Sequence, residues 1–259
     1  MNETQAPRRS TAPGPLLASG TRSTIHAWAD GVVAKVPKDA TPEGWIRAEA
    51  GYVAAVHRCG APAPRFIEIT TLDGREVALY ERIEGNSLWD ELRAAPARAS
   101  EIGRLLAQIH AGLLAMPGPM ALPSQHYRIR RKVRNAVARQ LVMPPADLPE
   151  LGSEQLMLCH GDLHPKNILM SPSGPIVVDW FDASRGIAAA DVARTLVLLH
   201  GPEDETLPGH LQGVSSEALH SVRAAYLADI TALCDVSSDD LERWTPLQVA
   251  AQAGELLGA

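Results

Sequence analysis

The segment from Leu158 to Leu169, LCHGDLHPKNIL, constrains this chain more than any other feature, together with the run IVVDW at 176–180. Asp162 precedes Asn167 by five positions, and Asp179 follows Asn167 by twelve. An apolar run that ends in an Asp is typical of a strand that delivers a carboxylate to a site. Carboxylate and amide oxygens are hard ligands that suit Mg²⁺. The alternative is a polar loop in which Asp and Asn only form turns.

The spacing of Asp162 and Asn167 reproduces the D-x-x-x-x-N of a kinase catalytic loop. In that pattern Asp162 is the base that accepts the proton of an attacking hydroxyl, while Asn167 and Asp179 bind the metal. The run HGDLHPKN at 160–167 resembles the aminoglycoside phosphotransferase family, whose relatives include choline kinases and homoserine-type kinases. The resemblance covers roughly residues 15–200 and is strongest over 158–195. It implies an α+β, bilobal protein-kinase-like fold.

A kinase-like N-terminal lobe needs a lysine for the nucleotide phosphates. Residues 23–36 predict two strands around Asp30-Gly31, a strong hairpin turn signal, and the second strand carries Lys35. Thr41 and Pro42 predict an N-cap and first turn for a helix that stops near residue 60. Glu49 on that helix is the predicted partner that orients Lys35, with Glu43 as the competing candidate.

Two further parts of a nucleotide site are less distinctive. The loop ASGTRST at 18–24 has one glycine where protein kinases have three. The resemblance makes Ser19, Gly20, Thr21 and Ser23 candidates for the phosphates, although an ordinary loop between strands would look the same. A second predicted hairpin, over 65–71 and 76–83, leads to residues 81–84. The resemblance implies that backbone groups there, at Glu81 and Ile83, pair with a purine edge.

The resemblance also implies support for the catalytic loop. His160 belongs to the loop motif, and Asp191, at the start of a helix, matches a family residue that accepts backbone N–H groups of the loop. The alternative for Asp191 is a charge at a helix N-terminus. Asp182 is interpreted either as a ligand of a second Mg²⁺ or as a solvent-facing residue. His164 is interpreted either as packing the loop or as contacting the γ-phosphate.

The rest of the chain predicts helices. Ile102, Leu106 and Leu113 recur at helical spacing, and His110 on that stripe is expected to be a hydrogen-bonded core residue. Residues 128–139 hold six basic residues and no acid. Such a run attracts phosphate or nucleic acid. We interpret it instead as a solvated helix face, because the whole chain has a net charge of −6.

Charge gives the only hint about the acceptor. Residues 201–259 hold ten acidic and two basic residues. A clustered negative surface concentrates cationic substrates, and the resemblance implies carboxylates on C-terminal helices. Asp235, Asp239 and Asp240 are the predicted acceptor-binding residues. The alternative is that these acids cap a helix that begins after Ser237 and Ser238.

Composition and missing motifs exclude other classes. The 259 residues are 46% hydrophobic and 21% charged, as in an ordinary soluble globular protein. No apolar run reaches the ~18 residues of a membrane span, and the N-terminus lacks a signal-peptide core. Three isolated cysteines suit reduced thiols in the cytoplasm, and buried packing is the preferred interpretation of Cys159. No Walker A, dinucleotide-binding or zinc-protease motif occurs.

These observations predict a disordered tail over 1–14, a nucleotide-binding lobe of five antiparallel strands and one helix over 15–84, and a helical lobe over 85–259. The expected reaction is Mg²⁺-dependent transfer of the γ-phosphoryl group of ATP or GTP to a hydroxyl of a small, cationic molecule such as an aminoglycoside-type antibiotic. One alternative is a metabolic kinase for choline, homoserine or a sugar. Another is a catalytically silent nucleotide-binding pseudokinase. The expected partner is the small-molecule acceptor, with no nucleic acid and no membrane, and the sequence leaves the oligomeric state open.

Overall fold

The computed structural model describes residues 13–143, 156–199 and 213–256. The chain divides into two compact units, the first ending at Glu84 and the second beginning at Gly85. Most of the predicted disordered tail, residues 1–12, lies outside the described residues. Gly14 donates its backbone N–H to the carbonyl of Ala27 at 2.8 Å, so the described chain begins against a strand.

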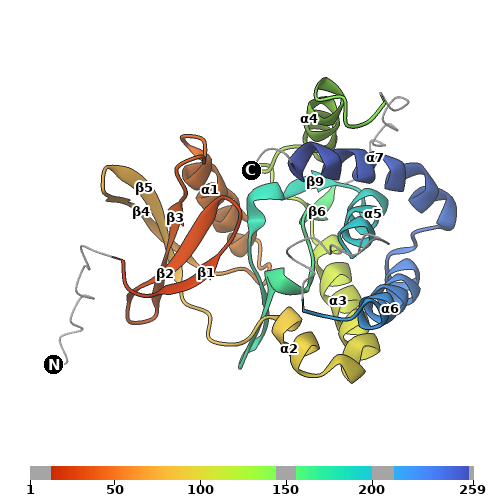
Figure 1. The fold of residues 1–259 in the computed structure, drawn as a ribbon, viewed down its shortest axis with the longest axis horizontal. Helices are drawn as coiled ribbons and strands as arrows, with labels where there is room; N and C mark the ends of the chain where they lie inside the picture. The colour runs from red at the N-terminus through yellow and green to blue at the C-terminus, as the bar shows by residue number, and fades with distance from the viewer. Residues whose placement is uncertain (1–12, 144–155, 200–212, 257–259) are drawn as a thin grey trace. The chain divides into compact units, whose positions relative to one another are not determined.

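The first unit is a five-stranded antiparallel sheet in the order β1-β2-β3-β5-β4, with one helix (Figure 1). Asp73 and Gly74 both have positive φ, as a two-residue hairpin turn requires. The elements are β1 (Leu16–Ser19), β2 (Ser23–Ala29), β3 (Val32–Pro37), α1 (Trp45–Arg58), β4 (Phe66–Leu72) and β5 (Arg75–Glu81). The five strands and single helix predicted from the sequence are therefore present.

The predicted start of α1 is wrong by a few residues. The helix begins at Trp45 behind Gly44, whose φ of 77° lies in the left-handed region. Thr41 does not cap it, because its hydroxyl donates to the carbonyl of Arg22 at 2.5 Å. Glu43 consequently lies before the helix and is exposed.

The second unit is mainly helical, with two small antiparallel sheets. Its helices are α2 (Leu88–Ala94), α3 (Ala99–Leu114), α4 (Gln125–Ala138), α5 (Ala188–Leu198), α6 (Ser216–Cys234) and α7 (Ser238–Leu256). Its strands are β6 (Met157–Cys159), β7 (Ile168–Ser171), β8 (Gly174–Val177) and β9 (Ser184–Gly186). Short 3₁₀ turns occupy Pro96–Arg98, Pro165–Asn167 and Trp180–Asp182. Strand β6 pairs with β9, and β7 pairs with β8.

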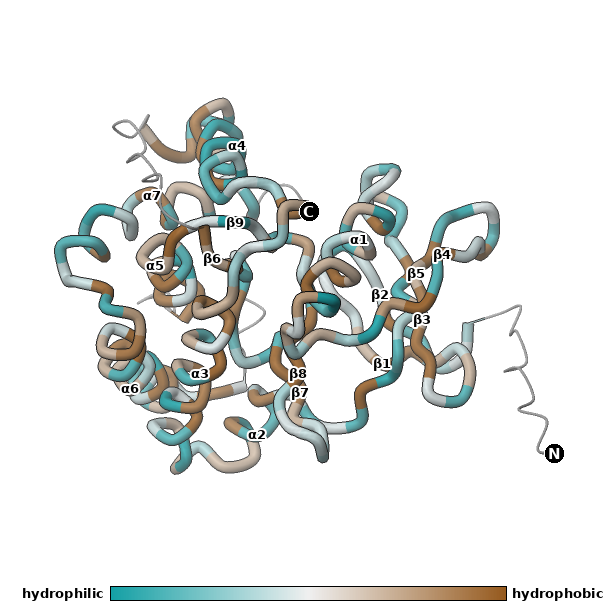
Figure 2. The backbone as a smooth tube through the Cα atoms, turned by 180° about the vertical axis from the view of Figure 1, so that it is seen from behind, coloured by the Kyte–Doolittle hydropathy of each residue, from teal (hydrophilic) through white to brown (hydrophobic). Residues whose placement is uncertain are grey.

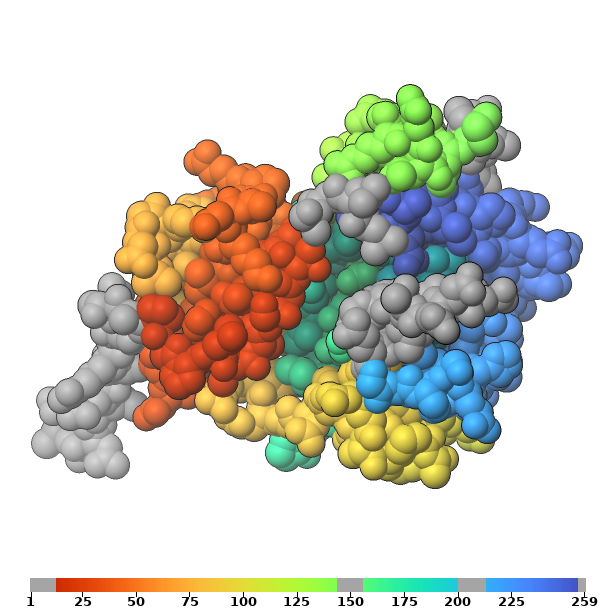
Figure 3. All heavy atoms as spheres, in the orientation of Figure 1, coloured from red at the N-terminus to blue at the C-terminus, as the bar shows by residue number. Residues whose placement is uncertain are grey.

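The core of this unit forms around α5, in which every residue is buried. Helices α3 and α6 pack side by side (Figure 1), and α4 lies against α7 at the surface seen in Figure 3. The buried Ile102, Leu106 and Leu113 confirm the predicted stripe on α3, and the hydropathy colouring of Figure 2 shows further apolar segments along α5 and α6. Within the described ranges, no helix combines the length and the apolar character needed to cross a membrane.

Candidate active site

Short strands bring the three residues of the catalytic motif to their positions. Asp162 follows β6 by three residues, and Asn167 immediately precedes β7. Asp179 comes two residues after β8, with φ 64° and ψ 63°, a left-handed conformation that Asp tolerates better than most residues. Because the N–H of Val178 donates to the carbonyl of Asn167 at 2.9 Å, the hairpin holds Asn167 next to the residue that precedes Asp179.

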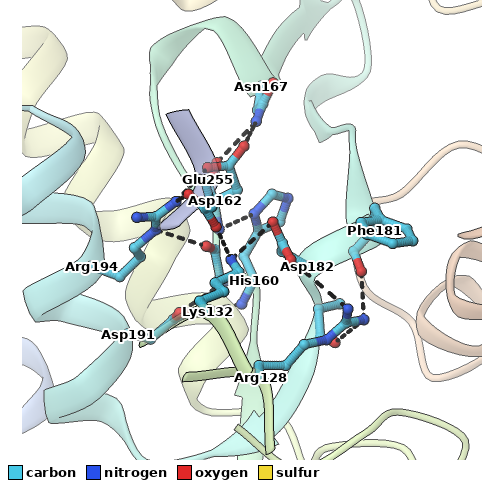
Figure 4. Close-up of polar contacts among 12 residues, drawn as sticks. Arg128, Lys132, His160, Asp162, Asn167, Phe181, Asp182, Asp191, Arg194 and Glu255 are labelled. Atoms are coloured by element: carbon cyan, nitrogen blue, oxygen red, sulfur yellow. Dashed lines mark hydrogen bonds and ion pairs between the residues drawn. The ribbon is translucent and has the colours of Figure 1, made fainter. Parts of the chain in front are cut away.

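The Asp162 carboxylate lies near nitrogen atoms from its own loop and from α5 (Figure 4). Asn167 Nδ2 lies 2.9 Å from the Asp162 carbonyl and 3.4 Å from Oδ2. Arg194 Nη2 lies 3.4 Å from Oδ1, and His164 Nε2 lies 3.9 Å from Oδ2. Burial raises the pKa of the Asp162 carboxyl to about 8, against the lowering effect of Arg194. The group is therefore poised to take up a proton near neutral pH.

Side chains of helix α5 hydrogen-bond to the backbone of the loop that carries Asp162. Asp191 accepts the backbone N–H of His160 at 2.8 Å and that of Gly161 at 2.9 Å. Arg194 donates from Nε to the Gly161 carbonyl at 3.2 Å, and Thr195 donates to the Leu163 carbonyl at 3.1 Å. Since positions i, i+3 and i+4 share one helix face, a single turn of α5 holds the loop backbone at three residues, His160, Gly161 and Leu163.

The Asp191 carboxylate is itself held from the core. His110 bridges it to Tyr226, with Nε2 at 3.1 Å from Asp191 and Nδ1 at 2.7 Å from the Tyr226 hydroxyl. Burial would raise the pKa of Asp191, but the hydrogen bond and charge of His110 outweigh it, so the pKa is lowered. His110 is thus the hydrogen-bonded core residue that its place on the apolar stripe predicted.

His160 supports the loop as a neutral ring. Its Nε2 donates to the Val178 carbonyl at 3.1 Å, and its Nδ1 accepts the N–H of Asp162 at 3.2 Å. Only one tautomer of neutral imidazole allows both contacts. Burial lowers the pKa of His160, which favours that neutral form. The ring therefore joins the segment before Asp179 to the catalytic loop. Cys159 beside it is buried, and burial raises the pKa of its thiol well above the ordinary value.

Helix α4 clamps the segment that follows Asp179. Arg128 donates to the Phe181 carbonyl at 2.5 Å and stands over the Phe181 ring at 5.2 Å. Lys132 pairs with Asp182 at 3.1 Å, and Arg128 lies 3.8 Å from the same carboxylate. Burial tends to raise the pKa of Asp182, but the charges of Lys132 and Arg128 lower it to about 2.

The structure changes two sequence interpretations at this clamp. Asp182 is not simply a solvent-facing residue, because two cations from α4 pair with it, while a role at a second Mg²⁺ stays a prediction. The basic run on α4 is not wholly a solvated face, since Arg128 is 6% exposed and Lys132 faces Asp182. Helical spacing separates these two residues from the exposed Arg130 and Arg134.

The first unit contains the predicted lysine–glutamate pair. Lys35 Nζ lies 2.5 Å from Glu49 Oε1, and the two side chains are 9% and 2% exposed. Nζ also stands 5.0 Å over the ring of Trp45. The partner of Lys35 is therefore Glu49 on α1 and not Glu43.

The candidate phosphate loop is a tight turn between β1 and β2. Gly20 donates its N–H to the Ser23 carbonyl at 2.9 Å, and Lys38 Nζ donates to the Gly20 carbonyl at 2.5 Å. Ser19 and Thr21 are exposed, whereas Ser23 is 7% exposed. Thr21 therefore lies at the exposed tip of the turn, whereas the Ser23 side chain is buried.

The candidate purine-binding stretch is partly used within the first unit. The N–H of Glu81 donates to the Arg65 carbonyl at 3.0 Å, and that of Arg82 donates to the Gly31 carbonyl at 2.9 Å. The Glu81 side chain accepts the N–H of Arg65 at 2.7 Å. The Glu81 N–H is therefore occupied within the first unit, and the carbonyl of Glu81 and the backbone of Ile83 remain the predicted purine contacts.

The three predicted acceptor acids lie at the end of α6 and the start of α7. Ser237 and Asp240 form a reciprocal cap at the start of α7, with Oγ 2.6 Å from the Asp240 carboxylate and the Asp240 N–H 3.1 Å from Oγ. Asp235 ends α6 with φ 49°, and Asp239 is exposed. From Asp239 to Glu255, which contacts the Arg194 side chain, α7 rises roughly 24 Å. Asp240 therefore fills the capping alternative, whereas Asp235 and Asp239 as acceptor ligands stay a prediction.

The donor set fits a magnesium–nucleotide complex. Because the Asn167 amide donates its NH₂ to Asp162, its oxygen points away from that carboxylate (Figure 4) and can serve as a hard ligand. In the part of the chain that the structure describes, no three His, Cys, Asp or Glu side chains gather into a metal cage. Mg²⁺ commonly takes one or two protein oxygens and completes its shell with phosphates and water, as Asn167 and Asp179 would require.

Comparison with known proteins agrees with this geometry. Residues 16–226 match the model of the phosphotransferase enzyme family. The chain belongs to this family. A comparison with curated protein sequences finds no match.

Solved structures of similar fold include other phosphotransferases. APH(3'')-Id from Streptomyces rimosus is 18% identical, with a TM-score of 0.63 over 93% of this chain and 92% of that one. An aminoglycoside-3'-phosphotransferase of type VIII is 21% identical, with a TM-score of 0.59 over 94% of each chain. A choline kinase from Cryptosporidium parvum is 13% identical, with a TM-score of 0.55 over 93% of this chain and 83% of that one. The predicted family, kinase-like α+β fold and kinase class are confirmed.

The sequence interpretation of this phosphotransferase missed Arg194 and Glu255. Arg194 touches the catalytic loop twice and pairs with Glu255 at 2.5 Å. Its spacing was a usable signal, because a residue three positions after Asp191 lies on the same face of α5. Glu255 offered no such signal, since it stands 61 residues from its partner, outside any motif.

Proposed function

We propose that the protein is a Mg²⁺-dependent kinase that transfers the γ-phosphoryl group of a nucleoside triphosphate to a hydroxyl group of a small molecule. The observation that carries this proposal is the Asp162 carboxylate, raised in pKa by burial and fixed between Asn167 and Arg194. Phosphoryl transfer asks little covalent chemistry of the protein, so position and charge supply most of the rate.

Each residue has a separate task in this reaction. Asp162 orients the acceptor hydroxyl and takes its proton as the bond to phosphorus forms. Asn167 and Asp179 hold Mg²⁺, which neutralises charge on the phosphates when it is bound. Lys35 contacts the phosphates, and Glu49 keeps the Lys35 ammonium in place. Thr21 at the loop tip and the backbone of Ile83 are the remaining nucleotide contacts.

The nucleotide donor and the hydroxyl acceptor are proposed only as chemical classes. Similar structures include an APH(2")-IIIa complex with GDP and kanamycin and an APH(3'')-Id complex with ADP and streptomycin, so either a guanine or an adenine nucleotide suits this fold. A cationic acceptor is the first candidate, because residues 201–259 carry ten acids and two bases. A metabolic hydroxyl acceptor such as choline or a sugar is the second, since the similar structures include a choline kinase.

A coupled assay for nucleoside diphosphate release tests the proposal. It should be run with ATP and GTP over aminoglycosides, other cationic antibiotics, choline and sugars. Asp162→Asn should lower kcat roughly 10²–10⁴-fold while nucleotide binding stays nearly intact. Asp30→Asn is the matched control, because Asn-Gly favours the same exposed turn as Asp-Gly. More than about a tenth of wild-type kcat in Asp162→Asn would exclude Asp162 as the base.

Ionic strength tests the charge of the acceptor. Carboxylates near the surface attract a cation less at high salt, since the Debye length falls from ~10 Å at 0.1 M to ~3 Å at 1 M. The KM of a cationic acceptor should therefore rise with salt more than the KM of the nucleotide. A neutral best acceptor with a salt-independent KM would favour a metabolic kinase.

The metal ligands are tested by two acids three residues apart. Asp179→Ala should abolish the dependence of nucleotide binding on Mg²⁺, measured by titration calorimetry with a nonhydrolysable nucleotide. Asp182→Asn should leave that dependence in place, because Asp182 is paired with α4. Equal losses in both variants would mean that the metal site is assigned to the wrong carboxylate.

A further inference from the structure

Arg194 is shared between the catalytic carboxylate and a second acid. Its Nη2 lies 2.5 Å from Glu255 Oε2 but 3.4 Å from Asp162 Oδ1. Its Nε donates to the Gly161 carbonyl at 3.2 Å, and the whole residue is 3% exposed. The guanidinium is therefore anchored to the loop backbone, and its Nη2 makes a short contact with Glu255 and a longer hydrogen bond with Asp162 (Figure 4).

The last turn of α7 is built to deliver Glu255. A Cβ atom on Gly254 would meet the Lys132 carbonyl at 2.2 Å and the Ala136 nitrogen at 3.1 Å, so only glycine lets α7 approach α4 this closely. Lys132 Nζ pairs with the other Glu255 oxygen, Oε1. The close approach and the second cation together fix the carboxylate beside Arg194.

The space next to Glu255 and Arg194 is too small for a substrate. The cavity lined by Lys132, Asp182 and Arg194 offers about 20 Å³, which is space for roughly one water molecule. Both oxygens of Glu255 are already engaged by cations from α4 and α5. The arrangement therefore serves the placement of Arg194 rather than the binding of an acceptor.

Building on the proposed role of Asp162 as base, we propose that Glu255 is a positioning residue that holds Arg194 off the Asp162 carboxylate and so keeps that carboxylate open to the acceptor hydroxyl. Guanidinium groups close readily onto carboxylates as bidentate pairs. Without a competing acid, Arg194 would move the remaining distance to Asp162. It would then cover the oxygen that must receive the proton.

Glu255→Gln removes the competing charge with little change in shape. It should lower kcat at least 10-fold and leave the KM values for nucleotide and acceptor within about 2-fold. Glu242→Gln, on an exposed position of the same helix, is the matched control and should change neither constant. A rise in the acceptor KM at unchanged kcat would show instead that Glu255 contacts the acceptor, and would overturn the proposal.

The decisive comparison adds Arg194→Met to Glu255→Gln. If Arg194 causes the loss by closing on Asp162, its removal restores part of kcat, and the double variant exceeds Glu255→Gln alone. Losses that multiply would show that the two residues act independently and would also overturn the proposal. Should Glu255→Gln fail to fold, Glu255→Asp keeps the charge but shortens the side chain, and the same comparison with Arg194→Met applies.

Asp162→Asn separates this inference from the proposed function. An inactive Asp162→Asn beside an unaffected Glu255→Gln would reject only the positioning role. An active Asp162→Asn would reject Asp162 as the base, whatever Glu255→Gln does.

Discussion

Two ion pairs, one in each unit, show opposite uses of a glutamate. Lys35 and Glu49 are 2.5 Å apart, and so are Arg194 and Glu255. On the proposed function, Glu49 holds a cation toward the phosphates that it must touch, whereas Glu255 holds a cation away from the carboxylate that must stay open. The two pairs have the same separation but different proposed roles. The difference lies in the group that each cation faces, which is the nucleotide phosphates for Lys35 and the Asp162 carboxylate for Arg194.

The Lys35 pair should give the largest effect. Lys35→Met removes a charge from the phosphates and should lower kcat roughly 10²–10³-fold, as the loss of one transition-state donor does. It also leaves Glu49 buried and uncompensated, which costs about 3–5 kcal/mol of stability. Steady-state kinetics and urea denaturation measure the two consequences.

Adding Glu49→Gln to Lys35→Met separates those consequences. The double variant should regain stability but not activity, because the orphaned charge is gone while the phosphates still lack their lysine. Recovery of activity would mean that Lys35 only neutralises Glu49. The proposed contact of Lys35 with the phosphates, which distinguishes this pair from Arg194 and Glu255, would then be wrong.

A substitution at Lys132 should have an effect of intermediate size, because Lys132 pairs with both Glu255 and Asp182. Burial alone would raise the pKa of Asp182, but Lys132 and Arg128 lower it to about 2. A folded-state pKa below the unfolded value stabilises the protein above about pH 4, and this stabilisation is lost as the pH falls through 2. Lys132→Met should therefore cost about 2–4 kcal/mol at pH 7.

The pH dependence provides the check for Lys132→Met. The difference in unfolding free energy between wild type and variant should shrink as the pH falls from about 4 toward 2, where Asp182 is protonated in both proteins. Arg134→Met, on an exposed position of the same helix, is the control. A difference that stays constant with pH would show that Lys132 stabilises α4 through packing alone.

The sequence predicted one of these pairs and not the other for a physical reason. Lys35 and Glu49 are separated by 14 residues, and a strand, a turn and a helix in that order leave few ways to place them. Arg194 and Glu255 are separated by 61 residues, and their meeting depends on where α7 lands against α4. Local patterns specify a strand or a helix, but the docking of one helix on another rests on packing that no short motif encodes.

The candidate site shows the same limit. Motif spacing predicted Asp162, Asn167 and Asp179, and the family resemblance added Asp191 as a support of the loop. Net charge and the resemblance suggested Asp235, Asp239 and Asp240, but net charge identifies a region rather than a position. The fold places Asp235 at the end of α6, Asp239 and Asp240 in the first turn of α7, and Glu255 in its last turn.

The smallest effect is expected at that far end of α7. Asp240→Asn weakens the reciprocal cap with Ser237, whose hydrogen bonds lower the pKa of Asp240, and should cost roughly 0.5–1 kcal/mol of stability. Its kcat and its acceptor KM should match those of the wild type, as should those of Asp239→Asn, because neither residue lies near Arg194 or Asp162. Thermal denaturation and steady-state kinetics at low salt, where surface charges act most strongly, provide the measurement. A severalfold rise in acceptor KM in either variant would return the acceptor to this end of the helix. Asp239 or Asp240 would then contribute to acceptor binding, and the role proposed for Glu255 in placing Arg194 would be tested separately by its own variants.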